Sequence, residues 1–212
     1  MRILLLSFLL FFAGQLFAQE EGKSDSSELH LEAAFFSNTP SFPLSGRVFI
    51  LPYHPGLDIG VSSPFSIKER GKWEWTASLS SYYHRLSAHA VNIQAGLRYR
   101  QTGLRDSSGN GFGWELAFNG GYLHAFGLRP KFELNEETGE YEQVPATGRS
   151  QFSMGITTGP AYRLPSAPDW QLFMNYRIWA RLPYVAEYVP ILPNVAFHLG
   201  VRYRIPQKGG SK

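Results

Sequence analysis

Three histidines are the residues of this sequence best suited to chemistry, because the segments that carry them are predicted to end at one rim of a folded domain. They are His54, His84 and His124. Neutral imidazoles that gather at one place bind a metal ion or act as general bases. We therefore take all three as candidate metal ligands, and His84 and His124 as candidate catalytic residues. The competing interpretation is that they are ordinary polar residues of the rim.

Serine hydroxyls elsewhere in the chain add a hydrolase hypothesis. The candidate nucleophiles are Ser80, Ser81 and Ser153, and the candidate bases are His84 and His124. Nothing in the spacing fixes their geometry, and the two histidines fall on opposite faces of their predicted strands. No Gly-x-Ser-x-Gly, phosphate-loop or His-Glu-x-x-His motif is present, and no cofactor is predicted. An enzyme is therefore the weaker of the functional hypotheses.

The elements that must position these residues are strands, because side-chain character alternates with period two after residue 42. In one such segment the apolar residues Val91, Ile93 and Ala95 alternate with Asn92 and Gln94. The predicted strands cover residues 44–53, 57–67, 73–84, 88–100, 112–125, 150–164, 169–181 and 195–205. Eight strands of about ten residues suit an all-β fold, an antiparallel up-and-down transmembrane β-barrel.

Both ends of the chain are predicted to lie outside this barrel, which spans residues 43–205. A single positive charge precedes an apolar run and a small residue at position 18, so residues 1–18 have the layout of a secretory signal peptide. Residues 19–42 are predicted to be a flexible leader, in which residues 29–36 form either a short helix or a strand. Residues 206–212 form a polar C-terminal tail.

Composition excludes several classes of protein. The chain has no cysteine, which excludes a cysteine-linked lipid anchor, disulfides and thiolate metal sites. Its 20 Lys and Arg residues against 17 Asp and Glu residues leave a balance too even to predict nucleic-acid binding. Many of the arginines fall inside predicted strands, whereas ten of the acids lie in two polar segments at 20–32 and 133–142.

The two faces of the predicted strands differ, and this favours lipid on the outside. Aromatic residues lie near strand ends on the apolar face, as in the girdles of membrane barrels: Trp73, Trp75, Tyr83, Tyr99, Trp170 and Tyr203. The opposite face is charged or polar: Glu74, Asn92, Gln94, Arg98, Glu115, Asn119, Asn175, Arg177, His198 and Arg202. An eight-stranded barrel is just wide enough to be filled by side chains, so this face predicts a lumen of ion pairs.

Two segments of the chain repeat one pattern. Residues 93–100 and 197–204 share Gly-x-Arg-Tyr-Arg, and both are predicted to run down to the periplasmic side. The outer loops then lie near residues 54–56, 85–87, 126–149 and 182–194. The third is the longest and contains an acidic cluster between Glu133 and Glu142. Long outer loops and short inner turns are usual in these barrels, although residues 101–111 make a rather long inner turn.

On these patterns the chain resembles the small outer-membrane β-barrel proteins of bacteria with a Gram-negative envelope. The resemblance covers most of the mature chain and rests on strand alternation, without a specific motif. It implies location in the bacterial outer membrane, contact with outer-membrane lipids and insertion by the outer-membrane assembly machinery. Such barrels often end on an aromatic residue, whereas here Pro206 to Lys212 follow the last predicted strand.

Three functions are consistent with this sequence. The main hypothesis is a structural or interaction role through the outer loops, with an extracellular or envelope protein as partner. The second is a lipid-modifying enzyme at the outer leaflet, of the lipid A deacylase or acyltransferase type. The third is a soluble periplasmic barrel whose apolar face turns inward around an apolar ligand.

Overall fold

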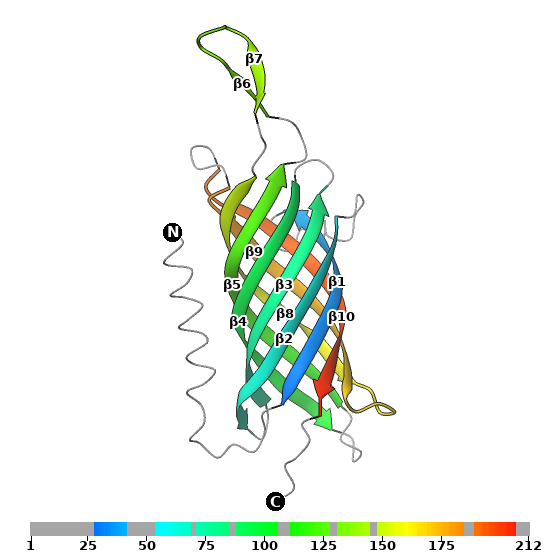
Figure 1. Cartoon of the computed structure of the whole chain (residues 1–212). Helices are drawn as coiled ribbons and strands as arrows, with labels where there is room; N and C mark the ends of the chain where they lie inside the picture. The colour runs from blue at the N-terminus through cyan, green and yellow to red at the C-terminus, as the bar shows by residue number, and fades with distance from the viewer. Residues whose placement is uncertain are drawn as a thin grey trace, which may run out of the picture.

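The computed structural model describes residues 28–41, 54–68, 71–84, 88–105, 111–127, 131–144, 148–184 and 189–206. Eight strands form a closed antiparallel barrel (Figure 1): β1 (Leu29–Pro40), β2 (Pro55–Lys68), β3 (Gly71–His84), β4 (Ala88–Arg105), β5 (Gly111–Gly127), β8 (Arg149–Arg163), β9 (Trp170–Leu182) and β10 (Leu192–Ile205). The remaining strands, β6 (Lys131–Leu134) and β7 (Tyr141–Val144), pair only with each other. The predicted fold class is confirmed.

The barrel closes because its first strand pairs with its last. Leu29 of β1 lies opposite Ile205 of β10, and the register continues to Pro40 opposite Asn194. Every other strand pairs with its neighbours along the chain, except that β5 pairs with β8 because the β6–β7 hairpin is inserted between them. Closure leaves the eight described barrel strands without an unpaired edge, which is what strands need in a bilayer.

The start of the barrel differs from the prediction. The strand expected over residues 44–53 lies outside the described residues, and β1 begins at Leu29, within the predicted leader. Like residues stand side by side in β1, as in Ala33-Ala34 and Phe35-Phe36, and this conceals the alternation. Phe36 is nevertheless buried, whereas Phe35 is 76% exposed. The barrel therefore begins at Leu29 and not at residue 43.

The other seven predicted strands are present with small changes at their ends. The largest change is in β4, which continues to Arg105, so the long inner turn expected over residues 101–111 is shorter. Gln101 and Thr102 remain paired with Trp114 and Gly113 of β5, because ladder pairing does not depend on side-chain polarity. The predicted signal peptide, residues 19–27 and residues 207–212 lie outside the described residues.

The polarity of the barrel is the reverse of that of a water-soluble domain. Ile93 and Leu199 on the outer face are 59% and 61% exposed, whereas Glu74 and Arg202 on the inner face are 0% and 1% exposed. An outer face with so many exposed apolar side chains is stable only in contact with lipid. The predicted membrane-spanning construction is thereby confirmed. Among the described residues, no helix is long and apolar enough to cross a membrane.

Aromatic residues line the outer face at the end of the barrel where β1 starts. Trp73 lies against Tyr99, with ring centroids 5.1 Å apart, and Trp170 lies against Tyr203 at 4.9 Å. Both pairs join neighbouring strands in directly opposed positions. Amphipathic rings prefer the boundary between lipid tails and water, so these pairs mark one membrane interface.

Two inward-facing glycines let neighbouring strands approach closely. A Cβ at Gly96 of β4 would collide with the backbone oxygen of Phe118 in β5, and a Cβ at Gly121 of β5 would collide with that of Ile93 in β4. Any larger residue would push the β4–β5 pair apart.

Candidate functional site

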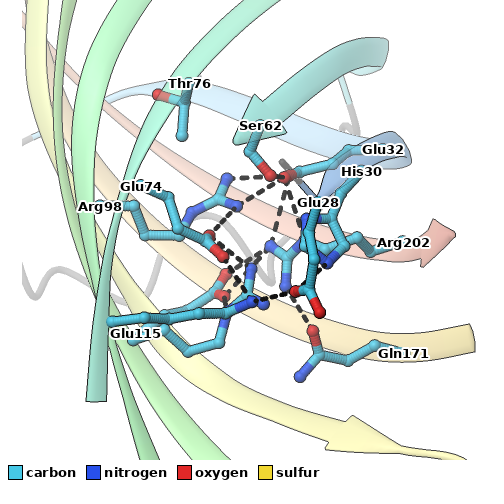
Figure 2. Close-up of polar contacts among 12 residues, drawn as sticks. Glu28, His30, Glu32, Ser62, Glu74, Thr76, Arg98, Glu115, Gln171 and Arg202 are labelled. Atoms are coloured by element: carbon cyan, nitrogen blue, oxygen red, sulfur yellow. Dashed lines mark hydrogen bonds and ion pairs between the residues drawn. The ribbon is translucent and has the colours of Figure 1, made fainter. Parts of the chain in front are cut away.

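Six charged residues meet across one end of the lumen and form what we call the ionic belt (Figure 2): Glu32, Glu74, Arg98, Arg100, Glu115 and Arg202. All six come from inward positions on five strands: β1, β3, β4, β5 and β10. Three carboxylates face three guanidinium groups, so the belt is neutral as a whole. A charge held away from water is tolerated only when it is paired in this way.

Glu32 of β1 is shared by two arginines. Arg98 Nη2 donates to Glu32 Oε2 at 2.8 Å, and Arg202 Nε donates to Glu32 Oε1 at 3.0 Å. Ser62 Oγ adds a third donor at 2.6 Å. Glu32 therefore fixes the position of arginines that belong to opposite walls of the barrel.

The repeated Gly-x-Arg-Tyr-Arg pattern accounts for this arrangement. Its first arginine is Arg98 in β4 and Arg202 in β10, and these strands stand four positions apart in the ring of eight. The two copies therefore face each other across the lumen, and both arginines reach Glu32. The tyrosines of the pattern, Tyr99 and Tyr203, point outward to the aromatic pairs.

The other two acids of the belt complete the pairing. Arg202 Nη2 lies 3.1 Å from Glu115 Oε2, and Arg100 Nη2 donates to Glu74 Oε2 at 2.7 Å. Asn175 Nδ2 donates to Glu115 Oε1 at 2.6 Å. The belt thus joins neighbouring strands, as between β3 and β4, and strands on opposite walls, as between β1 and β4.

Charged residues continue from the belt to the barrel end. Lys72 Nζ lies 3.1 Å from Glu74 Oε1 and 3.4 Å from Glu28 Oε2. Glu28 precedes β1; partial burial raises the pKa of its carboxyl, but Lys72 and His30 lower it further, so its pKa lies below the ordinary value. Glu28 therefore stays ionised at neutral pH and keeps Lys72 paired.

A second, aromatic layer crosses the lumen toward the other end, and we call it the aromatic cap. Its larger members are Phe36, Tyr82, Leu123 and Trp179. Tyr82 lies edge-on to both Phe36 and Trp179, with ring centroids 6.2 and 6.0 Å apart. Trp179 Nε1 donates to Asn38 Oδ1 at 3.0 Å, which satisfies the only polar atom of the indole. The cap and the belt are thus two layers of contacting side chains at different levels of the lumen.

The candidate metal ligands do not converge. His54 and His84 meet at the mouth of the lumen with stacked rings, 3.8 Å between centroids, whereas His124 lies on the outer face beside Phe126. Burial lowers the pKa of His54, so this imidazole is neutral at neutral pH. Among the described residues, no three His, Asp or Glu side chains are placed to hold a metal ion.

The candidate serine nucleophiles are also separated. Ser80 and Ser153 face the lumen and are almost fully buried, and Ser153 Oγ donates to Asn92 Oδ1 at 2.9 Å. Ser81 faces outward, and its Oγ lies 2.8 Å from Nε2 of His89. The catalytic candidates His84 and His124 do not share one site, since one lines the mouth and the other faces outward.

Two of the residues in these contacts were not singled out from sequence. His89 pairs with Ser81, and Ser150 lies 3.4 Å from Nδ1 of His124, with the Tyr122 hydroxyl 2.7 Å from Ser150 Oγ. Strand parity was the available signal, because Ser81, His89 and Ser150 all share the lipid-facing parity of their strands. The missing information was the register that brings β3 next to β4 and β5 next to β8.

Comparison with known proteins gives similarity of structure only. No protein-family model and no curated protein matches the chain. A designed transmembrane β-barrel is 12% identical, with 87% of this chain and 100% of that chain covered and a TM-score of 0.41. Ail, the attachment invasion locus protein of Yersinia pestis, is 10% identical, with 85% and 99% covered and a TM-score of 0.41. The outer membrane protein OprG from Pseudomonas aeruginosa is 10% identical, with 86% and 97% covered and a TM-score of 0.42.

The belt predicts which arginine the barrel needs most. Arg202→Gln removes the cation nearest to Glu115, which then keeps, among the described residues, only Arg100 at 3.6 Å. It also leaves one side of Glu32 unpaired. Breaking a buried pair in this way costs about 3–5 kcal/mol. Arg204→Gln is the matched control, because Arg204 is more exposed and pairs with Asp169 at the barrel end; we expect at most about 1 kcal/mol. Urea unfolding of the protein refolded into detergent micelles measures both. Equal effects of the two substitutions would contradict the role given to the belt.

Proposed function

We propose that this chain is a small integral protein of the bacterial outer membrane, whose barrel is an anchor and whose outer loops contact another molecule of the envelope or the exterior. Its outer face would contact outer-membrane lipids, and the outer-membrane assembly machinery would insert it. The belt and the cap both cross the lumen. This supports the role of an anchor more than that of a pore for large solutes. The β6–β7 hairpin is the observation that carries the interaction role.

The hairpin extends beyond the barrel end as a regular structure of its own (Figure 1). Asn135 N donates to Glu140 O at 2.9 Å, and Gly139 N donates to Asn135 O at 2.8 Å. Asn135 Oδ1 also accepts from Glu137 N at 2.9 Å. Gly139 has a φ of 69°, a conformation that glycine adopts without strain. The tip is therefore a defined turn and presents the two strands in a fixed register.

One face of the hairpin is apolar and exposed. Leu134 lies directly opposite Tyr141, and Phe132 shares their face by strand parity. These side chains are 52%, 72% and 54% exposed, respectively. An isolated two-stranded hairpin is only marginally stable in water. Binding of a partner over its exposed apolar face would therefore stabilise it. Exposed acids lie at the tip, Glu136, Glu137 and Glu140, and on the opposite face, Glu142. They favour a partner surface with an apolar centre and a basic rim.

Site-specific photo-cross-linking in intact cells tests this role. A photoreactive phenylalanine at position 141 is expected to give a discrete protein adduct, and the added substitution Phe132→Ser is expected to reduce that adduct at least about fivefold, because it removes part of the contact face. The same photoreactive residue at position 35, which faces lipid, is the control and should give no such adduct. If position 141 gives no protein adduct while the barrel is assembled normally, the hairpin is not a docking element.

A lipid-modifying enzyme is the second candidate function, and the Ser81–His89 pair favours it. The 2.8 Å contact has the geometry of a nucleophile and its base. His89 lies ten residues from Tyr99 along β4, a rise of about 25 Å for a tilted strand, which is the height of the apolar band. The pair would therefore lie at the outer-leaflet interface, where it would act on a lipid ester.

An activated serine reacts with a fluorophosphonate, so labelling of the micelle-bound protein decides this second candidate. The enzyme hypothesis predicts labelling that Ser81→Ala abolishes and that His89→Gln reduces at least tenfold. Ser150→Ala, beside the other outward histidine, is the matched control and should keep its label. Absence of label on the wild-type protein would remove the Ser81–His89 pair as a catalytic dyad.

The soluble ligand-binding barrel receives no support from the described residues. That function needs an apolar cavity inside and polar side chains outside. The inner face instead carries the ionic belt, and large apolar residues such as Ile93 and Leu199 lie outside. An apolar ligand would find no matching surface in the lumen.

A further inference from the structure

A small cavity of about 60 Å³ lies in the lumen beside the ionic belt. It exists because several inward residues of the surrounding strands are short, among them Ala34, Gly60 and Ala117. Its polar wall includes Asp58, Ser78, Asn119, Asn175, Arg177 and His198. The volume is enough for a few water molecules or for one small ion with water.

Several polar groups of this cavity are buried without a partner. Nε and Nη2 of Arg177 have no hydrogen-bond partner among the described residues, although Arg177 is only 5% exposed. Nε2 of His198 and Oδ1 of Asn175 are also without one, in side chains that are 7% and 5% exposed. Such groups cost free energy unless something in the cavity binds them. Arg177 alone has two donors without a partner, so the group most clearly missing is a hydrogen-bond acceptor.

The cavity wall leaves Arg177 as the group that most needs an acceptor. Glu32 and Glu115 also line the cavity, but both are paired with arginines of the ionic belt, and Asp58 is the other acid of the wall. Arg177 also lies 5.4 Å from the centre of the Trp179 ring, a contact that does not neutralise its charge. The two unpartnered nitrogens of this cation favour an anion as the acceptor.

We propose that this cavity binds a small monovalent anion, of the size of chloride, on the free nitrogens of Arg177. The nitrogens Nε and Nη2 lie on one edge of the guanidinium group and donate in parallel, which suits a single spherical acceptor. Bound chloride would accept from both nitrogens and join the β9 wall to the rest of the lumen. The site is independent of the hairpin and of the Ser81–His89 pair.

Refolding in matched salts tests the site, because an anion that binds only the folded barrel raises its Tm with the logarithm of anion concentration. Wild-type protein refolded from urea into micelles in sodium chloride should melt several degrees above protein refolded in sodium gluconate at equal ionic strength. Arg177→Gln should remove this difference. Arg181→Gln, a buried arginine of the same strand outside the cavity wall, should retain it. Asp58→Asn should enlarge it, because it removes the competing carboxylate.

Crystals of the wild-type protein grown in sodium bromide provide a readout that does not depend on how the variants fold. The proposal predicts an anomalous bromide peak in hydrogen-bond contact with Arg177. A cavity that holds water only would give no peak and an equal Tm in chloride and gluconate, and either result would overturn the proposal. A chloride effect of equal size in wild type, Arg177→Gln and Arg181→Gln would also overturn it, because it would be an effect of salt on the surface.

Discussion

Buried charges of opposite sign must find each other inside this barrel, and much of its structure follows from that requirement. Three glutamates and three arginines from β1, β3, β4, β5 and β10 meet in the ionic belt, and Glu32 holds arginines from opposite walls. With the polar residues neutralised inside, the outer face is free to be apolar and to contact lipid. The same pairing crosses the lumen, so the interaction that stabilises the barrel also fills this level of its interior.

Much of the fold was predictable from sequence, because period two is a direct consequence of a wall with lipid on one side and a packed polar lumen on the other. Residues 73–84 and 195–205 show this alternation plainly, and the strands are found there. The first strand was misplaced because Ala33-Ala34 and Phe35-Phe36 put like residues on opposite faces. Which of these residues face inward depends on the pairing of β1 with β10 and β2, and the local sequence does not contain this information.

The site was predictable only in its residue types. Sequence assigned Arg98, Glu115 and Arg202 to the polar face, but the partners of each depend on which strands stand opposite in the closed ring. The histidines show the same limit: His54 and His84 meet at the mouth, whereas the lipid-facing parity of His124 places it outside. Arg177 and the cavity beside it follow from how short side chains combine from several strands, which alternation does not show.

Spin labelling on β4 tests the central claim most directly, and the chain is suited to it because it has no native cysteine. Nitroxides would be attached to cysteines at positions 93 and 97, with position 141 on the hairpin as the water-exposed reference, after refolding into lipid bilayers. Labels at 93 and 97 should collide often with oxygen and rarely with a water-soluble nickel chelate, as expected for side chains in lipid. High accessibility of both labels to the nickel chelate would contradict the lipid-facing assignment, and with it the description of a polar core held in an apolar shell.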